Sequence, residues 1–176
     1  MEIHAIVASA TGWPKTKYAQ IERERRWLCE HVPHDRVLRS STINDLYLTG
    51  TQLRVREMRD PATGAVAFKL TRKGDISASA RMITTIYLSK PEFALLSGLP
   101  GFRIEKTRYT VAGDDGFELA FDEFAGRLAG LILAEVEFAC EADMNAYTPP
   151  AFLGREVTDD PRYTGGELAK LAVPGS

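Results

Sequence analysis

The sequence is poor in cysteine and histidine, the residues that most often mark disulfides and zinc sites. It has two cysteines and three histidines, and neither type shows the spacing of a CxxC pair or of a zinc centre. We therefore expect Cys29 and Cys140 to be reduced thiols, and we place His31 and His34 in a loop. This cysteine usage favours a cytoplasmic protein.

Long hydrophobic segments and an excess of either charge are also missing. No apolar run reaches the length of a membrane span, and the first twenty residues lack the charged start and apolar centre of a secretory signal. The 22 basic and 24 acidic residues leave a formal net charge of -2, and no basic tract stands out. Because nucleic acids and anionic membranes attract basic surfaces, we expect neither as a partner.

The composition is that of an ordinary globular protein, with 44% hydrophobic and 26% charged residues among 176. This length is enough for one domain with a sizeable core. We find no internal repeat, low-complexity segment or linker that would separate two domains. We therefore expect a short N-terminal extension over residues 1–19 and a single domain over residues 20–176.

Most of the chain has the pattern of β-strands separated by turns. Residues 60–64 and 113–116 are strong turn signals, each between two strands. Helices are predicted after the cap at Ser89, near Glu141, and over residues 165–172. The strands are predicted over residues 20–28, 45–48, 52–59, 65–73, 80–88, 103–112, 117–124 and 133–139.

Within these strands, charged and apolar residues alternate. Leu53 and Val55 face one way, whereas Arg54 and Arg56 face the other. Residues 68–73, 105–109 and 133–138 repeat this pattern, and some strands contribute basic pairs where others contribute acidic pairs. A solvated sheet face usually mixes charged and small polar residues, so this segregation favours a closed sheet with a charged interior. Such an interior is costly unless its charges are paired or bind a ligand.

The order of these charged residues resembles a known family. The spacing Glu22-x-Glu24-x-Arg26 resembles the ExExK signature of the CYTH domain, which belongs to the triphosphate tunnel metalloenzyme superfamily. Residues 156–169 resemble the closing C-terminal segment of that family, so the resemblance covers about residues 20–170. The other matching positions are Arg54, Arg56, Lys73 with Lys69 as second choice, Arg81, Lys106, Arg108, Asp122, Glu135 and Glu137.

The sequence departs from the family pattern in two respects. Arg26 stands where the signature has lysine, which keeps the charge but replaces a point donor by a planar fork. Many members also carry RxExE on the strand after the lysine strand. Here Arg81 is followed by Ile83 and Thr85, so both acidic positions are lost. This departure puts one metal or substrate contact in doubt.

The resemblance implies an α+β protein with a closed antiparallel β-barrel, a tunnel of about eight strands with a few flanking helices. It implies a linear triphosphate bound inside the tunnel with Mg²⁺ or Mn²⁺, and phosphoryl transfer to water. Hard cations prefer oxygen ligands, which the carboxylates Glu22, Glu24, Asp122, Glu135 and Glu137 would supply. The phosphates would be bound by Arg26, Arg54, Arg56, Lys73, Arg81, Lys106 and Arg108. The catalytic set implied is Glu22, Glu24, Glu135 and Glu137. The pairs Glu22/Glu24 and Glu135/Glu137 would hold one metal each or share one.

Several functions are compatible with these residues. The first is a metal-dependent triphosphatase acting on inorganic tripolyphosphate or on an organic or nucleoside triphosphate. Adenylate cyclase is a second reading, although we identify no site for adenine or for the ribose 3′-hydroxyl. The third is a module that binds polyphosphate or nucleotide without turnover, which the losses at Ile83 and Thr85 would favour. A barrel without phosphate function is the fourth. Many tunnel proteins self-associate, so a homodimer is also compatible.

Overall fold

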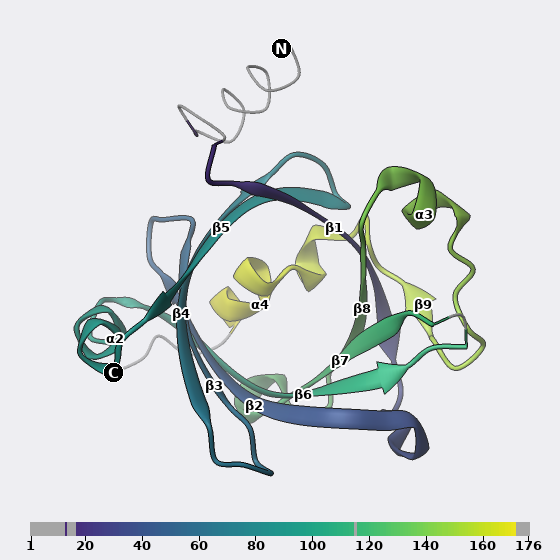
Figure 1. Cartoon of the computed structure of the whole chain (residues 1–176), viewed down its shortest axis with the longest axis horizontal. Coiled ribbons are helices and arrows are strands. Elements are labelled where there is room, and N and C mark those ends of the chain that lie inside the picture. Colours follow the sequence, from purple (N-terminus) through teal and green to yellow (C-terminus); the bar gives the residue numbers. More distant parts are fainter. Residues whose placement is uncertain (1–12, 14–16, 115, 172–176) are drawn as a thin grey trace.

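The chain folds into a closed antiparallel barrel that Figure 1 views nearly end-on. The computed structural model describes residues 13, 17–114 and 116–171. Eight strands form the closed wall in the order β5-β4-β3-β2-β6-β7-β8-β1, and pairing of β1 with β5 closes the ring. Their bounds are β1 Gln20–Cys29, β2 Val37–Leu48, β3 Leu53–Arg59, β4 Val66–Asp75, β5 Ala80–Leu88, β6 Gly101–Ala112, β7 Glu118–Phe124 and β8 Ile132–Phe138.

The closing seam between β1 and β5 is short. It runs from the pair Gln20 and Ile83 to the pair Arg23 and Ala80. Past this seam, β1 pairs with β8 over seven positions, and the short strand β9 (Arg155–Glu156) adds to β1. The predicted closed antiparallel barrel is therefore confirmed.

The three helices of the described residues match the sequence prediction. They are α2 (Lys90–Ser97), α3 (Glu141–Ala146) and α4 (Gly165–Leu171). At the start of α2, the Ser89 and Glu92 side chains cap each other's backbone N–H groups in a capping box, which confirms the cap predicted at Ser89. Short 3₁₀ turns lie at η1 (His34–Arg36), η2 (Gly126–Leu128) and η3 (Pro161–Tyr163).

The largest apolar core lies against the outer side of the barrel wall. Trp27, Phe121 and Val136 are almost fully buried there, beneath residues that follow α3, such as Tyr147. A second cluster packs the buried Leu168 of α4 against side chains from β6, β7 and β8. Figure 1 shows α4 lying across the barrel. The first cluster therefore holds the wall to the segments outside it, whereas the second holds α4 against the inner face, where Ile104, Leu133 and Leu168 also line the cavity.

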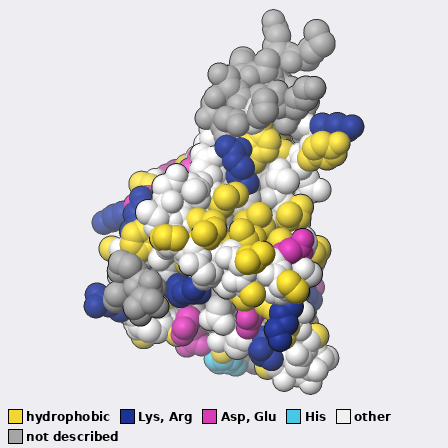
Figure 2. Space-filling view, turned by 90° about the vertical axis from the view of Figure 1, so that its left-hand side faces the viewer, with side chains coloured by type: hydrophobic (Ala, Val, Ile, Leu, Met, Phe, Trp, Pro, Cys, Tyr) yellow, Lys and Arg dark blue, Asp and Glu magenta, His cyan; other side chains and the backbone are white. Residues whose placement is uncertain are grey.

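Hydrophobic side chains also gather on the outer face that Figure 2 shows, the side of the barrel that carries α2, β4 and β5. Val66, Ile86 and Leu95 are among the exposed large hydrophobic residues. Near them, the Trp13 indole N–H donates to the Thr84 hydroxyl at 3.3 Å, and the Arg72 guanidinium lies 3.7 Å from the indole ring centroid. Most of the predicted extension, residues 1–12 and 14–16, falls outside the described residues.

Among the described residues, no helix has both the length and the apolar character needed to cross a membrane.

Candidate functional site

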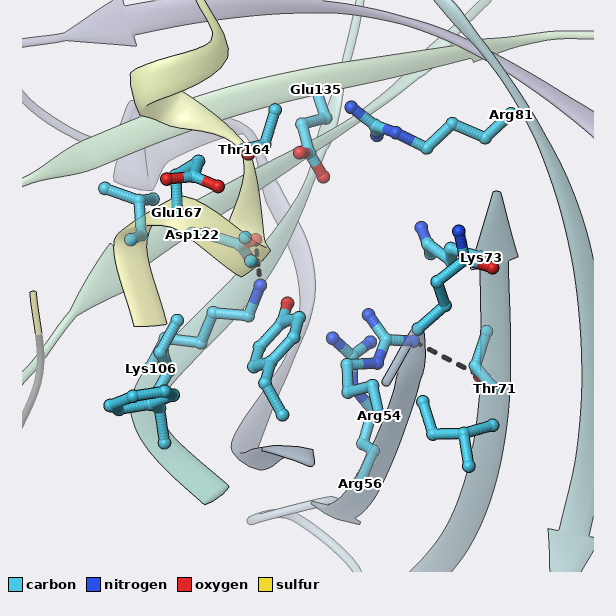
Figure 3. A pocket seen from close by; sticks show the side chains of 18 of the residues that line it. Arg54, Arg56, Thr71, Lys73, Arg81, Lys106, Asp122, Glu135, Thr164 and Glu167 are labelled. Atoms are coloured by element: carbon cyan, nitrogen blue, oxygen red, sulfur yellow. Dashed lines mark hydrogen bonds and ion pairs between the residues drawn. The ribbon is translucent and has the colours of Figure 1, made fainter. Parts of the chain in front are cut away.

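The inner face of the barrel encloses a cavity of about 600 Å³ with a strongly charged lining. Nine basic and seven acidic residues contribute to the lining, a formal excess of two positive charges. Figure 3 shows that side chains from opposite walls converge on this space. All twelve residues that the sequence singled out for phosphate or metal line it: Glu22, Glu24, Arg26, Arg54, Arg56, Lys73, Arg81, Lys106, Arg108, Asp122, Glu135 and Glu137.

Strand alternation and register place the acidic residues of β1 and β8 side by side. Glu24 is directly opposite Glu137, and Arg26 is directly opposite Glu135. Glu22 follows on the same face of β1 because side chains alternate along a strand. Like charges directly opposite each other destabilise a sheet. The pairing of Glu24 with Glu137 therefore requires nearby cations.

Arginines supply some of this compensation on the β1–β8 wall. The Arg26 guanidinium, which is only 2% exposed, contacts Glu24 and donates to Glu135 at 3.0 Å. Arg108 donates to Glu135 at 3.1 Å and to both oxygens of Asp122 at 2.6 and 2.7 Å. Lys106 also contacts Asp122. These carboxylates and bases form one connected network.

Strand β5 carries the two positions where the acidic residues of the family pattern are lost. Ile83 is directly opposite Lys73, and Thr85 is directly opposite Thr71, to which it is joined by a hydroxyl contact of 3.0 Å. With isoleucine at position 83, the Lys73 ammonium instead donates across the seam to Glu22 at 2.6 Å.

Arg81, from the same strand, contacts Glu24 and donates to Asp75 at 2.9 Å. Its guanidinium therefore links the β1 carboxylates to the end of β4.

On strands β2 and β3, basic side chains surround a single buried carboxylate, that of Asp45. Arg56 donates both Nε and Nη2 to the carboxylate of Asp45, at 2.6 and 2.7 Å. Arg54 donates to the Thr71 hydroxyl at 3.4 Å, an interaction drawn in Figure 3. The buried nitrogens Arg54 Nε and Arg26 Nη1 have no acceptor within hydrogen-bond distance, and Arg54 Nε lies 3.8 Å from Asp45 Oδ1. Buried donors are normally satisfied, so these two nitrogens indicate a site for an oxygen-rich ligand.

The charges of the cavity shift the pKa values of its carboxylates in opposite directions. Burial by itself would raise the pKa of Glu135, but the charges of Arg26 and Arg108 hold it well below the ordinary value. Asp122 also has a lowered pKa, because Arg108 and Lys106 outweigh the effect of burial. The pKa of Glu137 is raised, first by burial and then by the charges of Glu22 and Glu24. A carboxylate in this setting would gain from a nearby cation.

The carboxylates provide the hard oxygen donors that Mg²⁺ and Mn²⁺ prefer. Among the described residues, however, no group of three or more His, Cys, Asp or Glu side chains is arranged to hold a metal as it stands. Instead, Lys73 holds Glu22, while Arg26 and Arg81 hold Glu24. The donor set therefore fits a divalent cation in its chemistry, provided that these side chains change partners.

Helix α4 and the residues before it close one end of the cavity. Tyr163, Thr164 and most of α4 contribute to the lining. Gly165 approaches the Tyr47 side chain so closely that an added Cβ would lie 2.2 Å from its hydroxyl oxygen. Glu167 accepts from Lys170 within the same helix. The segment that the sequence compared with a closing C-terminal segment, residues 156–169, therefore includes this closure.

Sequence reasoning missed several charged residues of this region. Asp45 comes from β2, where no site residue had been identified, and Asp75 comes from β4, where only basic residues had been identified. Glu167 and Lys170 come from α4. Asp75 lies two residues beyond the predicted strand 65–73, and β4 extends to include it. The carboxylate of Asp45 is the single acid in its stretch of β2, and only the register with Arg56 reveals its role.

An antiparallel barrel with a charged interior and a closing C-terminal helix defines the triphosphate tunnel fold, and comparisons with known proteins agree. A crystal structure of an inorganic triphosphatase matches with a TM-score of 0.61 and 33% identity, over 88% of this chain and 97% of that one. A protein from Pyrococcus horikoshii OT3 matches at 23% identity with a TM-score of 0.53, over 69% of this chain and 80% of that one, which supports the fold alone. No family model matches the sequence.

Relatives found by sequence identify the family to which the chain belongs. It is 35% identical over 158 residues to an inorganic triphosphatase of Nitrosomonas europaea, a match that covers 87% of this chain and 99% of the relative. A 68-residue match to an inorganic triphosphatase of Acetivibrio thermocellus is 46% identical and covers 38% of this chain and 41% of the relative. The chain belongs to the inorganic triphosphatase family of CYTH proteins.

Proposed function

We propose that this protein is a hydrolase that cleaves inorganic triphosphate bound in its tunnel, with Mg²⁺ or Mn²⁺ held by the tunnel carboxylates. The observation that carries the proposal is the pair of buried arginine nitrogens, Arg26 Nη1 and Arg54 Nε, that line the cavity without an acceptor. Phosphate oxygens are acceptors of the matching kind, and guanidinium groups bind them in strong, charge-assisted hydrogen bonds. The names of the two curated relatives support inorganic triphosphate as the substrate.

The basic residues would replace the water shell of the triphosphate. Arg54 and Arg56 extend from β3, Lys73 from β4, and Lys106 and Arg108 from β6. Donors from several strands would surround the phosphate chain and fix its course through the tunnel. Because their positions are set by the barrel, they need little reorganisation when charge develops on the transferred phosphoryl group.

The proposed metal ligands are Glu22, Glu24, Asp122, Glu135 and Glu137. When bound, a divalent cation supplies charge neutralisation on the phosphoryl oxygens and lowers the pKa of an attacking water. The chain's own contribution is to hold these carboxylates next to the phosphate-binding bases. Glu22, Glu24, Glu135 and Glu137 would serve the chemistry most directly, since β1 and β8 place them on one wall.

A phosphate-release assay tests this function. Purified protein is given tripolyphosphate, ATP or thiamine triphosphate, each with Mg²⁺, with Mn²⁺ and with a chelator. We expect metal-dependent release, fastest from tripolyphosphate. Faster release from ATP or thiamine triphosphate would overturn the choice of substrate. If the melting temperature rises with triphosphate but no phosphate is released from any of them, the protein is a binding module.

The remaining expectations from sequence stay predictions. They are a cytoplasmic location, self-association as a homodimer, the absence of nucleic-acid and membrane partners, and the domain bounds at residues 19 and 20.

A further inference from the structure

Four of the five proposed metal ligands are held by bases that are themselves proposed to bind phosphate. Glu22 pairs with Lys73, and Glu24 is contacted by Arg26 and Arg81. Glu135 is shared by Arg26 and Arg108, and Asp122 by Lys106 and Arg108. Among the ion pairs of the described residues, none includes Glu137. The proposed metal ligands and the proposed phosphate ligands are therefore paired with one another in the structure.

This arrangement has a direct thermodynamic consequence. A metal ion that binds these carboxylates must displace their bases, and a triphosphate that binds those bases must displace their carboxylates. Binding of either ligand therefore breaks ion pairs that the other ligand would also have to break. Breaking a buried ion pair without replacing the lost partner is strongly unfavourable. Binding of one ligand should therefore raise affinity for the other, and the effect must be reciprocal.

We infer that metal and triphosphate bind cooperatively in this tunnel by exchange of ion-pair partners, and that Lys73 is the residue that restrains Glu22 until phosphate arrives. The inference rests on the proposed function, because it takes both ligands from it. It adds a positioning role for Lys73 in metal binding, beyond its contact with phosphate.

The pair of Lys73 and Glu22 is the most easily exchanged in the network. Ile83 stands directly opposite Lys73 on β5, where a carboxylate could have held the ammonium within the β4–β5 wall. Lys73 reaches β1 instead, and its side chain is 29% exposed while that of Glu22 is 12% exposed. Glu24, by contrast, is held by two buried arginines. A single ammonium on a flexible stem is easier to redirect than two guanidinium groups.

Lys69 offers a matched control for Lys73. It lies four residues earlier on β4, faces the same cavity and carries the same charge. Its ammonium lies 5.1 Å from the ring centroid of Tyr87, and none of the ion pairs between described residues includes it. Removing Lys69 lowers the positive charge of the tunnel as much as removing Lys73 does. Only the Lys73 substitution also releases a carboxylate.

The first test measures metal binding in the complete absence of phosphate compounds. Mn²⁺ is titrated calorimetrically into the wild-type protein and into the Lys73→Met and Lys69→Met variants. A partly exposed ion pair is worth up to about 1 kcal/mol, so Lys73→Met should bind Mn²⁺ roughly twofold to fivefold more tightly than wild type. Lys69→Met should show a clearly smaller gain. Equal affinities of the two variants, or weaker binding by Lys73→Met, would overturn the inference.

The second test reverses the roles of the ligands. Binding of tripolyphosphate is measured with chelator present, which removes metal and so prevents the proposed hydrolysis. Glu22→Gln releases Lys73, whereas Glu137→Gln removes the same charge without releasing a base. Glu22→Gln should therefore bind tripolyphosphate more tightly than Glu137→Gln does. The reverse order, or equal affinity, would contradict partner exchange.

Failure of this inference can be told apart from failure of the proposed function. Wild-type protein that releases phosphate from tripolyphosphate, together with Lys73→Met and Lys69→Met variants of equal Mn²⁺ affinity, would keep the function and reject the exchange. Wild-type protein that neither binds nor hydrolyses any triphosphate would reject the function, and the exchange with it. Circular dichroism of each variant verifies that the barrel has formed.

Discussion

Asp45 illustrates how a single residue can position a side chain that lines the tunnel. Its carboxylate is 2% exposed and accepts two hydrogen bonds from Arg56, one of the proposed phosphate ligands. Burial by itself would raise the pKa of Asp45, but the charges of Arg56 and Arg54 outweigh it and hold the pKa well below its usual value. The pair fixes the Arg56 guanidinium on the wall of the cavity, so Asp45 supports the site although no sequence pattern indicated this role.

The lowered pKa of Asp45 predicts acid sensitivity. Its pKa is depressed in the folded state, whereas the unfolded chain protonates near pH 4. The unfolded state therefore binds more protons below that pH, and the stabilisation, complete above pH 4, is lost as the pH falls further. We expect the melting temperature to fall steeply between about pH 4 and pH 2, and less steeply in Asp45→Asn.

Thermal unfolding followed by circular dichroism across this pH range measures the effect. Asp45→Asn should be less stable than wild type at pH 7, because Arg56 loses its charged partner. Parallel curves for the two proteins would show that Asp45 does not contribute to the acid sensitivity.

At the scale of elements, local patterns predicted most of the barrel and the three helices of the described part of the chain. Alternation revealed the inward-facing charges of β3, β4 and β8, and the capping residues identified α2. The sequence prediction found only residues 45–48 of β2, which extends over Val37–Leu48. The earlier residues of β2 are mostly polar and lack alternation, and they are held by pairing with β6. The ion-pair partners could not be predicted from the sequence either, because strand register and closure of the β1–β5 seam bring together residues that are distant in the sequence.

Helix α4 provides a prediction at this scale. An added Cβ at Gly165 would lie 2.2 Å from the Tyr47 hydroxyl, whereas at Gly166 it would meet nothing within 4 Å. Gly165→Ala should therefore shift α4 or Tyr47 and cost about 1–3 kcal/mol of unfolding free energy. Gly166→Ala should be neutral or slightly stabilising, because alanine favours helix. Urea unfolding of both variants gives the comparison, and equal stabilities would show that α4 does not pack tightly against Tyr47.

At the scale of the whole molecule, the fold places its largest apolar core outside the barrel and its charges inside. Burying these charges costs free energy, and binding a charged ligand would offset that cost. A ligand that binds only the folded state stabilises it, by about 2.7 kcal/mol at one hundred times its dissociation constant. For a chain of this size, saturating tripolyphosphate with chelator present should raise the melting temperature by about 5–10 °C. Differential scanning fluorimetry measures this shift, and sulfate at equal ionic strength controls for general salt effects.

The most direct test of the central claim compares one carboxylate inside the tunnel with one that does not line it. Glu24→Gln and Glu156→Gln each remove one charge, and Glu156 pairs with Arg25 away from the cavity. Phosphate release from tripolyphosphate with Mg²⁺ or Mn²⁺ is measured for both variants and for wild type. We predict that Glu24→Gln keeps the fold and loses activity by about 100-fold or more, while Glu156→Gln stays within a few-fold of wild type. A folded Glu24→Gln protein with wild-type activity would contradict the assignment of the tunnel as the active site.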